Sequence, residues 1–411
     1  LRILPSVAFI SAFLNNTPVV VIFAPIIKHW AKSVNLPATK FLIPLSYVTI
    51  LGGICTLIGT STNLVVHGMI LEAGFEGFSM FELGKVGIFI AIAGIIYIFL
   101  FSKRLLPDAR PDTAVPDEEV EEGEKLHRVE AVLGARFPGI NKKLKDFNFQ
   151  RHYGAEVKEI KTRNGQRFVT NLDDVVLHEG DTLVVMADDT FIPTWGESSV
   201  FVLLTNGNEP DTSGKKKRWF ALLLLVLMIV GATVGELPVT KEMFPDIKLD
   251  MFFFVSITTI IMAWTNLFPA RKYTKYISWD ILITIACAFA ISKAMVNSGV
   301  AGCVAKFIIG VSDDYGPHVL LAMLFIITNL FTELITNNAA AALAFPLALS
   351  ISAQMGVSPT PFFVVICMAA SASFSTPIGY QTNLIVQGIG NYKFMDFVRI
   401  GLPLNIITFL I

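Results

Sequence analysis

Four short polar motifs interrupt apolar runs of this sequence. They are "NNT" (15–17), "GTSTN" (59–63), "TNN" (336–338) and "GYQTN" (379–383). Inside hydrocarbon an unpaired backbone N–H or C=O group is costly, so helices break there only where protein or a wet site surrounds the break. Free N–H groups at a helix N-terminus attract anions, whereas unwound carbonyls and Thr, Ser or Asn oxygens suit a hard cation such as Na⁺. The motifs therefore predict a site that binds an anion together with Na⁺.

The motifs divide into one expected cation site in each half of the chain and one anion site between them. The first Na⁺ site is expected at Asn16, Gly59, Thr60 and Asn63. The second is expected at Asn337, Thr376, Gly379 and Asn383. The anion is expected between the two tips, at Asn16, Thr17, Thr336, Asn337 and Asn338. None of the four motifs contains Lys or Arg, so helix dipoles and co-bound Na⁺ must balance the charge of the anion. We expect neither a transition metal nor an organic cofactor.

The motifs recur at a nearly constant offset. Placing "NNT" on "TNN" gives 336 − 15 = 321, and Pro25 on Pro346 gives 321 again. Gly59 on Gly379 and Asn63 on Asn383 give 320. One residue of slippage over this length indicates an internal repeat.

The composition places these motifs in a membrane protein. Of the 411 residues 53% are hydrophobic and only 16% are charged, and the mean hydropathy is +0.62. We therefore expect an α-helical polytopic membrane protein. The formal net charge of −1 argues against a nucleic-acid partner. An enzyme is the least favoured class, because no nucleophile stands with a base, and no metal-ligand cluster occurs, at useful spacing.

Apolar runs form two blocks on either side of a polar insert. Residues 1–102 are expected to form the first transmembrane repeat, 103–217 a cytoplasmic insert, and 218–411 the second repeat. Lysines after the first tip and basic residues around the insert face the cytoplasm by the positive-inside rule. The two tips then enter from opposite faces, which is an inverted repeat with re-entrant hairpins and broken helices. The repeat implies about three helices before the first tip that the chain as given does not contain.

The residues resemble the divalent anion:sodium symporters of the ion-transporter superfamily, whose tips carry Ser-Asn-Thr and whose broken helices carry Gly-Thr-x-x-Asn. The stretches "FLNNTPVVVIFAPI", "GGICTLIGTSTNLVV" and "TELITNNAAAALAFP" look most like the sulfate-transporter branch. Neither tip has Ser-Asn-Thr intact, and prolines usual before Asn63 are absent. The resemblance implies an elevator-like mechanism and a homodimer in the plasma membrane.

Short alternating strands are expected in two stretches of the insert, "LKDFNFQRHYGAEVKEIKTRNGQRF" (144–168) and "VVLHEGDTLVVMADDTFI" (175–192), with a turn at "EGD" (179–181). The insert resembles one copy of the TrkA C-terminal domain, a small α/β domain that accompanies this branch. A ligand-sensing gate and a plain scaffolding or dimerisation module both fit this pattern.

Two ionisable residues lie close to the motifs. Glu333 is either a functional acid at membrane depth or a buried carboxylate that satisfies loose N–H groups around the tip. His67 is either a proton shuttle or a packing histidine held by a hydrogen bond.

These observations favour sodium-coupled symport of sulfate, with membrane lipid and Na⁺ as further partners. The alternatives are a di- or tricarboxylate or another oxyanion as substrate. From another class, the alternative is a membrane anion sensor that signals through the insert.

Overall fold

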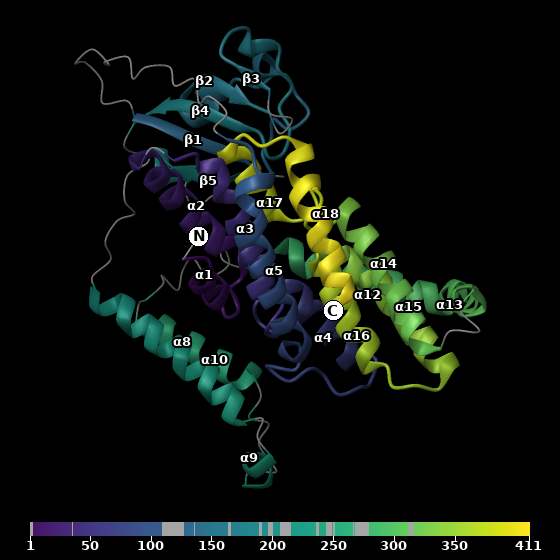
Figure 1. The fold of residues 1–411 in the computed structure, drawn as a ribbon. Helices are drawn as coiled ribbons and strands as arrows, with labels where there is room; N and C mark the ends of the chain where they lie inside the picture. The colour runs from purple at the N-terminus through teal and green to yellow at the C-terminus, as the bar shows by residue number, and fades with distance from the viewer. Residues whose placement is uncertain are drawn as a thin grey trace.

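The structure is a computed structural model, and it is mostly helical (Figure 1). It describes residues 3–34, 36–108, 127–134, 136–162, 166–188, 191–195, 200–205, 215–235, 238–243, 249, 251–265, 267, 279–311 and 316–411.

The first block consists of helices broken where the polar motifs stand. Its helices are α1 (Leu4–Ser11), α2 (Asn16–Ser33), α3 (Leu42–Gly53), α4 (Ser61–Glu72) and α5 (Gly84–Leu105). The "NNT" motif therefore separates α1 from α2, and the "GTSTN" motif separates α3 from α4. Only α5 runs without a break.

The second block repeats this pattern after several preceding helices. Those helices are α8 (Lys215–Gly235), α9 (Pro238–Met243), α10 (Met251–Trp264), α12 (Trp279–Asn297) and α13 (Val300–Val311). The broken pairs follow, as α14 (Pro317–Leu334) with α15 (Asn337–Met355) and α16 (Thr360–Ser371) with α17 (Gln381–Gly390), before the unbroken α18 (Phe394–Leu410). Pro25 lies inside α2 and Pro346 inside α15, so the matched prolines occupy the same place in their helices.

Several helices have the length and composition of membrane spans. Among the described residues, three helices are long and apolar enough to cross a membrane: Gly84–Leu105, Pro317–Leu334 and Asn337–Met355. Shorter apolar helices include Met251–Trp264 and Thr360–Ser371. The exposed faces of these helices carry large apolar side chains such as Phe89, Leu100 and Phe252, as expected of surfaces in contact with lipid.

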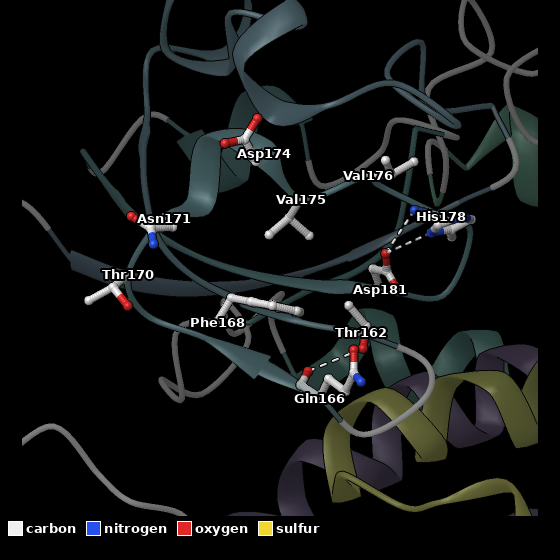
Figure 2. A pocket seen from close by; sticks show the side chains of 10 residues that line it. All are labelled: Thr162, Gln166, Phe168, Thr170, Asn171, Asp174, Val175, Val176, His178 and Asp181. Carbon is white, nitrogen blue, oxygen red and sulfur yellow. Dashed lines mark hydrogen bonds and ion pairs between the residues drawn. The ribbon is translucent and has the colours of Figure 1, made fainter.

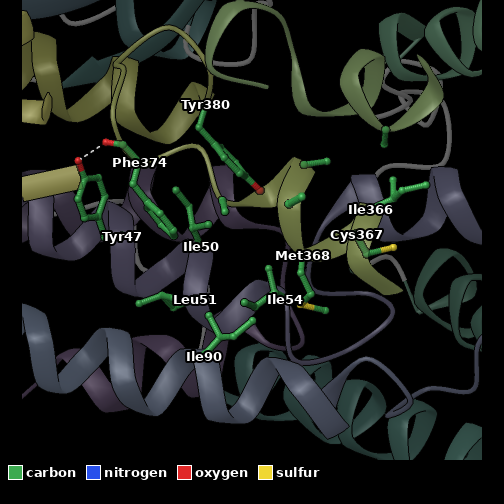
Figure 3. Close-up of a cluster of buried hydrophobic side chains, with 14 of the residues drawn as sticks. Tyr47, Ile50, Leu51, Ile54, Ile90, Ile366, Cys367, Met368, Phe374 and Tyr380 are labelled. Carbon is green, nitrogen blue, oxygen red and sulfur yellow. Dashed lines mark hydrogen bonds between the residues drawn. The ribbon is translucent and has the colours of Figure 1, made fainter. Parts of the chain in front are cut away.

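The apolar core joins the two halves. Residues of α3 and α16 and the break after α16 pack in one cluster, in which Tyr47, Ile50 and Phe374 are almost completely buried (Figure 3). The hydroxyl of Tyr47 donates to the carbonyl of Phe374 at 2.5 Å. Helices α1 and α3 approach so closely that a Cβ on Gly52 would overlap the backbone of Ala8. Only glycine fits at position 52, because the backbone of Ala8 occupies the place that a Cβ atom would take.

The insert forms a five-stranded antiparallel sheet at one end of the helices (Figure 1). Its strands are β1 (His127–Leu133), β2 (Glu156–Lys161), β3 (Arg167–Phe168), β4 (Thr182–Ala187) and β5 (Phe201–Thr205), in the order β3-β2-β4-β1-β5. The expected turn at 179–181 is present, with Gly180 at φ 83°.

One part of the insert differs from the strand prediction. Residues Phe149–Tyr153 form the short helix α6. The Asn148 side chain caps it by accepting from the backbone N–H of Arg151, and Gly154 ends it in the left-handed conformation. The alternating apolar pattern of this stretch arises from Phe149 and Tyr153 facing the core of the insert. A second short helix, α7, spans Phe191–Trp195.

Candidate functional site

The first tip places Asn16 at the start of α2 with 1% of its surface exposed. In the amide orientation that satisfies its neighbours, the nitrogen donates to the carbonyls of Thr49 (3.1 Å) and Gly59 (3.3 Å) and to the Ser11 hydroxyl (2.8 Å). Asn16 therefore ties the tip to both sides of the break between α3 and α4. The expected partners Asn16 and Gly59 do meet.

The second tip has the corresponding arrangement. Asn337, 8% exposed, starts α15, and its Oδ1 accepts from the hydroxyl of Thr332 at 2.7 Å. The Thr332–Asn337 pair lies 321 residues after the Ser11–Asn16 pair. Thr336 does something else, because it is exposed and its side chain caps α15 by accepting from the N–H of Ala339 at 3.4 Å. The structure thus gives Thr336 a role in helix capping and does not bring it to the buried residues.

The broken helices also make matching hydrogen bonds. Gly59 N donates to Thr56 Oγ1 at 3.2 Å, and Gly379 N donates to Thr376 Oγ1 at 3.3 Å. The Asn63 amide donates to the Thr56 carbonyl at 2.9 Å. The Asn383 amide donates to the Thr376 carbonyl at 3.2 Å and to the Ser373 carbonyl at 2.8 Å. Each threonine hydroxyl donates back to its own tip, to the carbonyl of Ala12 or of Glu333.

Each tip is bonded to the broken helix of the other half. The hydroxyl of Thr17 donates to Gln381 Oε1 at 3.2 Å. Asn338 Oδ1 accepts from the hydroxyls of Thr62 (3.0 Å) and Ser61 (3.4 Å). Ser61 and Gln381 are 320 residues apart, so the two crossed contacts occupy matching positions. The two halves therefore meet at their polar breaks as well as in the apolar core.

Tyr380 lies at the point where the two tips come together. Its hydroxyl is hydrogen-bonded to Asn16 of the first tip and to Thr60 Oγ1 at 3.0 Å, and the side chain of Asn337 of the second tip interacts with it. Tyr380 is 8% exposed and Thr60 is 2% exposed. It belongs to the same buried cluster as Phe374 and Ile50 (Figure 3).

The buried oxygens of the breaks are of the kind that could hold a hard cation. Asn63 is fully buried, and its Oδ1 has no hydrogen-bond partner among the described residues. Asn383 Oδ1, at the matching position, accepts from the Ser46 hydroxyl at 2.7 Å. A buried acceptor without a donor is costly, and Na⁺ bound at Asn63 Oδ1 would remove that cost. The residues of the first half therefore fit a cation better than those of the second half in this arrangement.

Glu333 serves the backbone around the second break. Its Oε1 accepts from the N–H of Ser375 at 2.8 Å and from the Asn405 amide at 2.7 Å. This agrees with the expectation of a buried carboxylate that satisfies loose N–H groups. His67 likewise matches the packing interpretation, since its Nδ1 accepts from the N–H of Phe78 at 3.0 Å.

The insert contacts helices that begin at the site. Glu130 on β1 pairs with Lys28 of α2 at 2.9 Å and with Lys161 at 3.5 Å. Burial raises the pKa of the Glu130 carboxyl, but the two lysine charges and the Lys28 hydrogen bond outweigh this and hold it at about 2. A Cβ on Gly180 would overlap the side chain of Leu384 in α17, at 2.6 Å. The sheet therefore packs directly against α2 and α17.

A separate pocket lies within the insert. Its cavity of about 700 Å³ is lined by residues that include Thr162, Gln166, Asn171, His178 and Asp181 (Figure 2). Asp181 accepts from the backbone N–H of His178 at 2.7 Å. None of the residues expected to bind Na⁺ or the anion lines this pocket, so it is distinct from the site at the breaks.

A helical body with buried, neutral polar groups at matched helix breaks is the architecture of a membrane transporter. The described residues contain no group of three or more His, Cys, Asp or Glu side chains arranged to hold a metal ion.

The comparisons agree with this class. The citrate transporter family model (CitMHS) matches residues 1–362 and 253–411, and the chain belongs to this family of the ion-transporter superfamily. An uncharacterized transporter of Synechocystis is 30% identical over 97% of this chain and 78% of its own length. A probable sodium/sulfate cotransporter of Chlamydomonas reinhardtii is 33% identical over 68% of this chain and 31% of its own length. A sodium-dependent dicarboxylate transporter of Staphylococcus saprophyticus is 28% identical over 34% of this chain and 27% of its own. The family and these relatives are transporters rather than enzymes.

Two site residues were missing from the sequence prediction although the repeat points to both. Thr56 matches Thr376 at the 320-residue offset, and Tyr380 matches Thr60. Thr56 was missed because it lies outside the "GTSTN" motif. Tyr380 was missed because tyrosine is not a usual Na⁺ ligand. The offset, rather than residue type, is the signal that finds them.

Proposed function

We propose that this chain couples the transport of sulfate across the membrane to Na⁺. The observation that carries the proposal is that the two tips lie across from the broken helices of the opposite halves, with Asn16 bonded to the buried Tyr380 hydroxyl and Asn338 bonded to Thr62. Asn16 and Asn337 each stand at the first residue of a long helix, where the helix dipole favours negative charge. Neutral amide and hydroxyl donors then bind a compact oxyanion without a Lys or Arg in the motifs.

The proposed Na⁺ sites lie beside the anion, one in each half. Asn63 Oδ1 with the Gly59 carbonyl and Asn16 would hold the first ion, with Thr60 beside them. Asn337, Thr376, Gly379 and Asn383 would hold the second after Asn383 Oδ1 leaves Ser46. Both ions would lower the cost of placing a divalent anion among buried groups.

Sulfate is favoured as the anion by the relatives named as sodium/sulfate cotransporters. A di- or tricarboxylate is the second candidate, supported by the description of the family and by the dicarboxylate relative. The matched hydrogen bonds support inverted repeats, with the two tips entering from opposite faces. An elevator-like movement in a homodimer of the plasma membrane, with residues 103–217 as a cytoplasmic TrkA C-terminal-like domain, completes the proposal.

Accumulation in sealed vesicles tests this function. Purified protein in proteoliposomes with an inward Na⁺ gradient should concentrate radiolabelled sulfate, and unlabelled anions should compete in the order of their affinity. A membrane sensor would bind sulfate without accumulating it. Binding without accumulation in tight vesicles would therefore reject transport, and stronger competition by citrate or succinate than by sulfate would reassign the substrate.

A further inference from the structure

We propose that Tyr380 sets the size of anion that the site accepts and donates its phenolic O–H to that anion. This inference rests on the proposed function, because it concerns the selectivity of the same site.

Tyr380 breaks the symmetry between the two halves. The offset of 320 residues that matches Gly59 to Gly379 and Asn63 to Asn383 also matches Thr60 to Tyr380. These two side chains contact each other, with Thr60 Oγ1 and the Tyr380 hydroxyl 3.0 Å apart. The halves therefore meet at this pair, and a small side chain on one side faces a large one on the other.

The tyrosine occupies the space between the tips. Its hydroxyl oxygen is bonded to Asn16 of the first tip and to Thr60 of the first broken helix, so a side chain of the second half reaches the polar groups of the first half. With threonine at both positions, the region now filled by the phenyl ring would be open. The ring therefore restricts the space beside the tips, which disfavours an extended dicarboxylate, with its two carboxylates, more than a compact tetrahedral anion.

The same hydroxyl is a suitable donor for the anion. A phenol has a single O–H to donate. In the Asn16 amide orientation described above, the Tyr380 hydroxyl donates to the Asn16 side-chain oxygen. An anion oxygen at the tips would compete for this proton and would also receive the freed donors of the asparagine amides. A hydrogen bond to a charged group is stronger than one to a neutral amide, so the hydroxyl turns from Asn16 to the anion when it binds.

Two substitutions separate the ring from the hydroxyl. Tyr380→Phe keeps the ring and removes the donor, so the concentration of sulfate for half-maximal uptake should rise roughly tenfold while the preference for sulfate over succinate is kept. Tyr380→Thr installs the residue of the other half and removes the ring. Succinate should then compete at least tenfold better relative to sulfate than it does in the parent.

Tyr392→Phe is the matched control. Tyr392 is also a fully buried tyrosine, and its hydroxyl is bonded to backbone at Thr39 and Ile43. Removing that hydroxyl should leave the ratio of sulfate to succinate unchanged. Size-exclusion chromatography of each detergent-purified variant shows which of them fold.

The readouts are competition by succinate against radiolabelled sulfate uptake and thermal stabilisation of the purified protein by sulfate or succinate in Na⁺. Should the parent accumulate neither anion, the proposed transport function fails, but the thermal shifts still decide the role of Tyr380. The proposal would be overturned if folded Tyr380→Thr kept the parent's preference for sulfate over succinate. It would also be overturned if sulfate and succinate stabilised this variant and the parent equally against thermal unfolding. If Tyr380→Thr does not fold, Tyr380→Phe decides alone, and unaltered sulfate affinity in that variant contradicts the donor role.

Discussion

Asn63 and Asn383 hold matching positions, but their side-chain oxygens do not have the same partners. Asn63 Oδ1 is without a hydrogen-bond partner among the described residues, whereas Asn383 Oδ1 accepts from Ser46. The repeat in the sequence predicts two equivalent cation sites and cannot reveal this difference. It arises because α3 brings the hydroxyl of Ser46, which lies outside the four motifs, to Asn383 Oδ1, whereas no described residue brings a donor to Asn63 Oδ1.

The first prediction concerns Asn63. Asn63→Ala removes a buried oxygen that would otherwise bind Na⁺, so the Na⁺ concentration for half-maximal uptake should rise roughly tenfold, the equivalent of about 1.5 kcal/mol. Thr328→Val is the control, since Thr328 of α14 is also fully buried, has no hydrogen-bond partner for its hydroxyl among the described residues, and lies outside the four motifs. Equal Na⁺ dependence in parent and Asn63→Ala would place the ion elsewhere.

The second prediction distinguishes charge from shape at Asn337. Asn337→Asp keeps an oxygen that accepts from Thr332, so the fold is preserved, but it places a negative charge beside the expected anion. In a partly desolvated site this repulsion exceeds the loss of one neutral hydrogen bond, which is about 0.5–1.5 kcal/mol. Sulfate uptake at neutral pH should therefore fall much further in Asn337→Asp than in Asn337→Ala. If Asn337→Asp took up sulfate as well as the parent, the second tip would not be part of the anion site.

The helix breaks need glycine at positions where neighbouring backbone or side-chain atoms leave no space for a Cβ atom. A Cβ on Gly379 would lie 2.5 Å from the Thr332 carbonyl oxygen and would overlap the Ser373 hydroxyl. A Cβ on Gly68 of α4 would meet nothing within 4 Å. Gly379 belongs to the "GYQTN" motif and Gly68 lies five residues after "GTSTN", yet only the structure shows which of them is confined.

The third prediction uses this contrast. Gly379→Ala should destabilise the protein by about 1–3 kcal/mol and abolish uptake, because the break must shift away from Thr332. Gly68→Ala should keep uptake and raise helix stability slightly, since alanine is favoured over glycine inside a helix. Thermal unfolding and sulfate uptake measure both effects. Full activity of Gly379→Ala would show that the tight geometry of the break is dispensable.

Most element boundaries follow from the sequence, since every expected interruption of an apolar run coincides with a break between described helices. The insert is less predictable. Strands β1 and β5 were not expected, and α6 lies in a stretch read as strand. Its five residues are too few for helical periodicity to show, and the capping by Asn148 and Gly154 decides the local structure. The crossed contacts between tips and breaks also lie beyond prediction, because they depend on how the two halves pack.

At the scale of the whole molecule, the insert is fastened to the helices that carry the site. Glu130 of the insert contacts Lys28, which lies on α2 twelve residues after Asn16. Gly180 of the insert packs against Leu384, which directly follows Asn383.

Deletion of residues 116–212 should leave anion binding intact, because every proposed ligand lies outside them. It should alter the transport rate, because the insert contacts α2 and α17. Loss of binding in a deletant that folds and reaches the membrane would contradict this.

The fourth prediction concerns pH. Because the pKa of Glu130 is lowered to about 2 in the folded protein, its ion pair stabilises the fold above its ordinary pKa of 4.5, and this contribution is lost as pH falls from there towards 2. Glu130→Gln should cost about 1–3 kcal/mol at neutral pH, and the difference from the parent should shrink across that window. Glu82→Gln, at the more exposed Lys85 pair, should change stability by less than about 1 kcal/mol. Thermal unfolding from neutral to acidic pH measures both, and a difference that stays constant below pH 4.5 would reject the pair as the cause.

In the proposed mechanism the two halves together bind one anion, and each half binds one Na⁺. The initial rate of sulfate uptake into proteoliposomes, measured as Na⁺ replaces choline at constant ionic strength, tests it most directly. We expect no concentrative uptake in choline and a sigmoidal rise with Na⁺ that reflects one ion in each half. Uptake of equal rate in choline and in Na⁺ would contradict it.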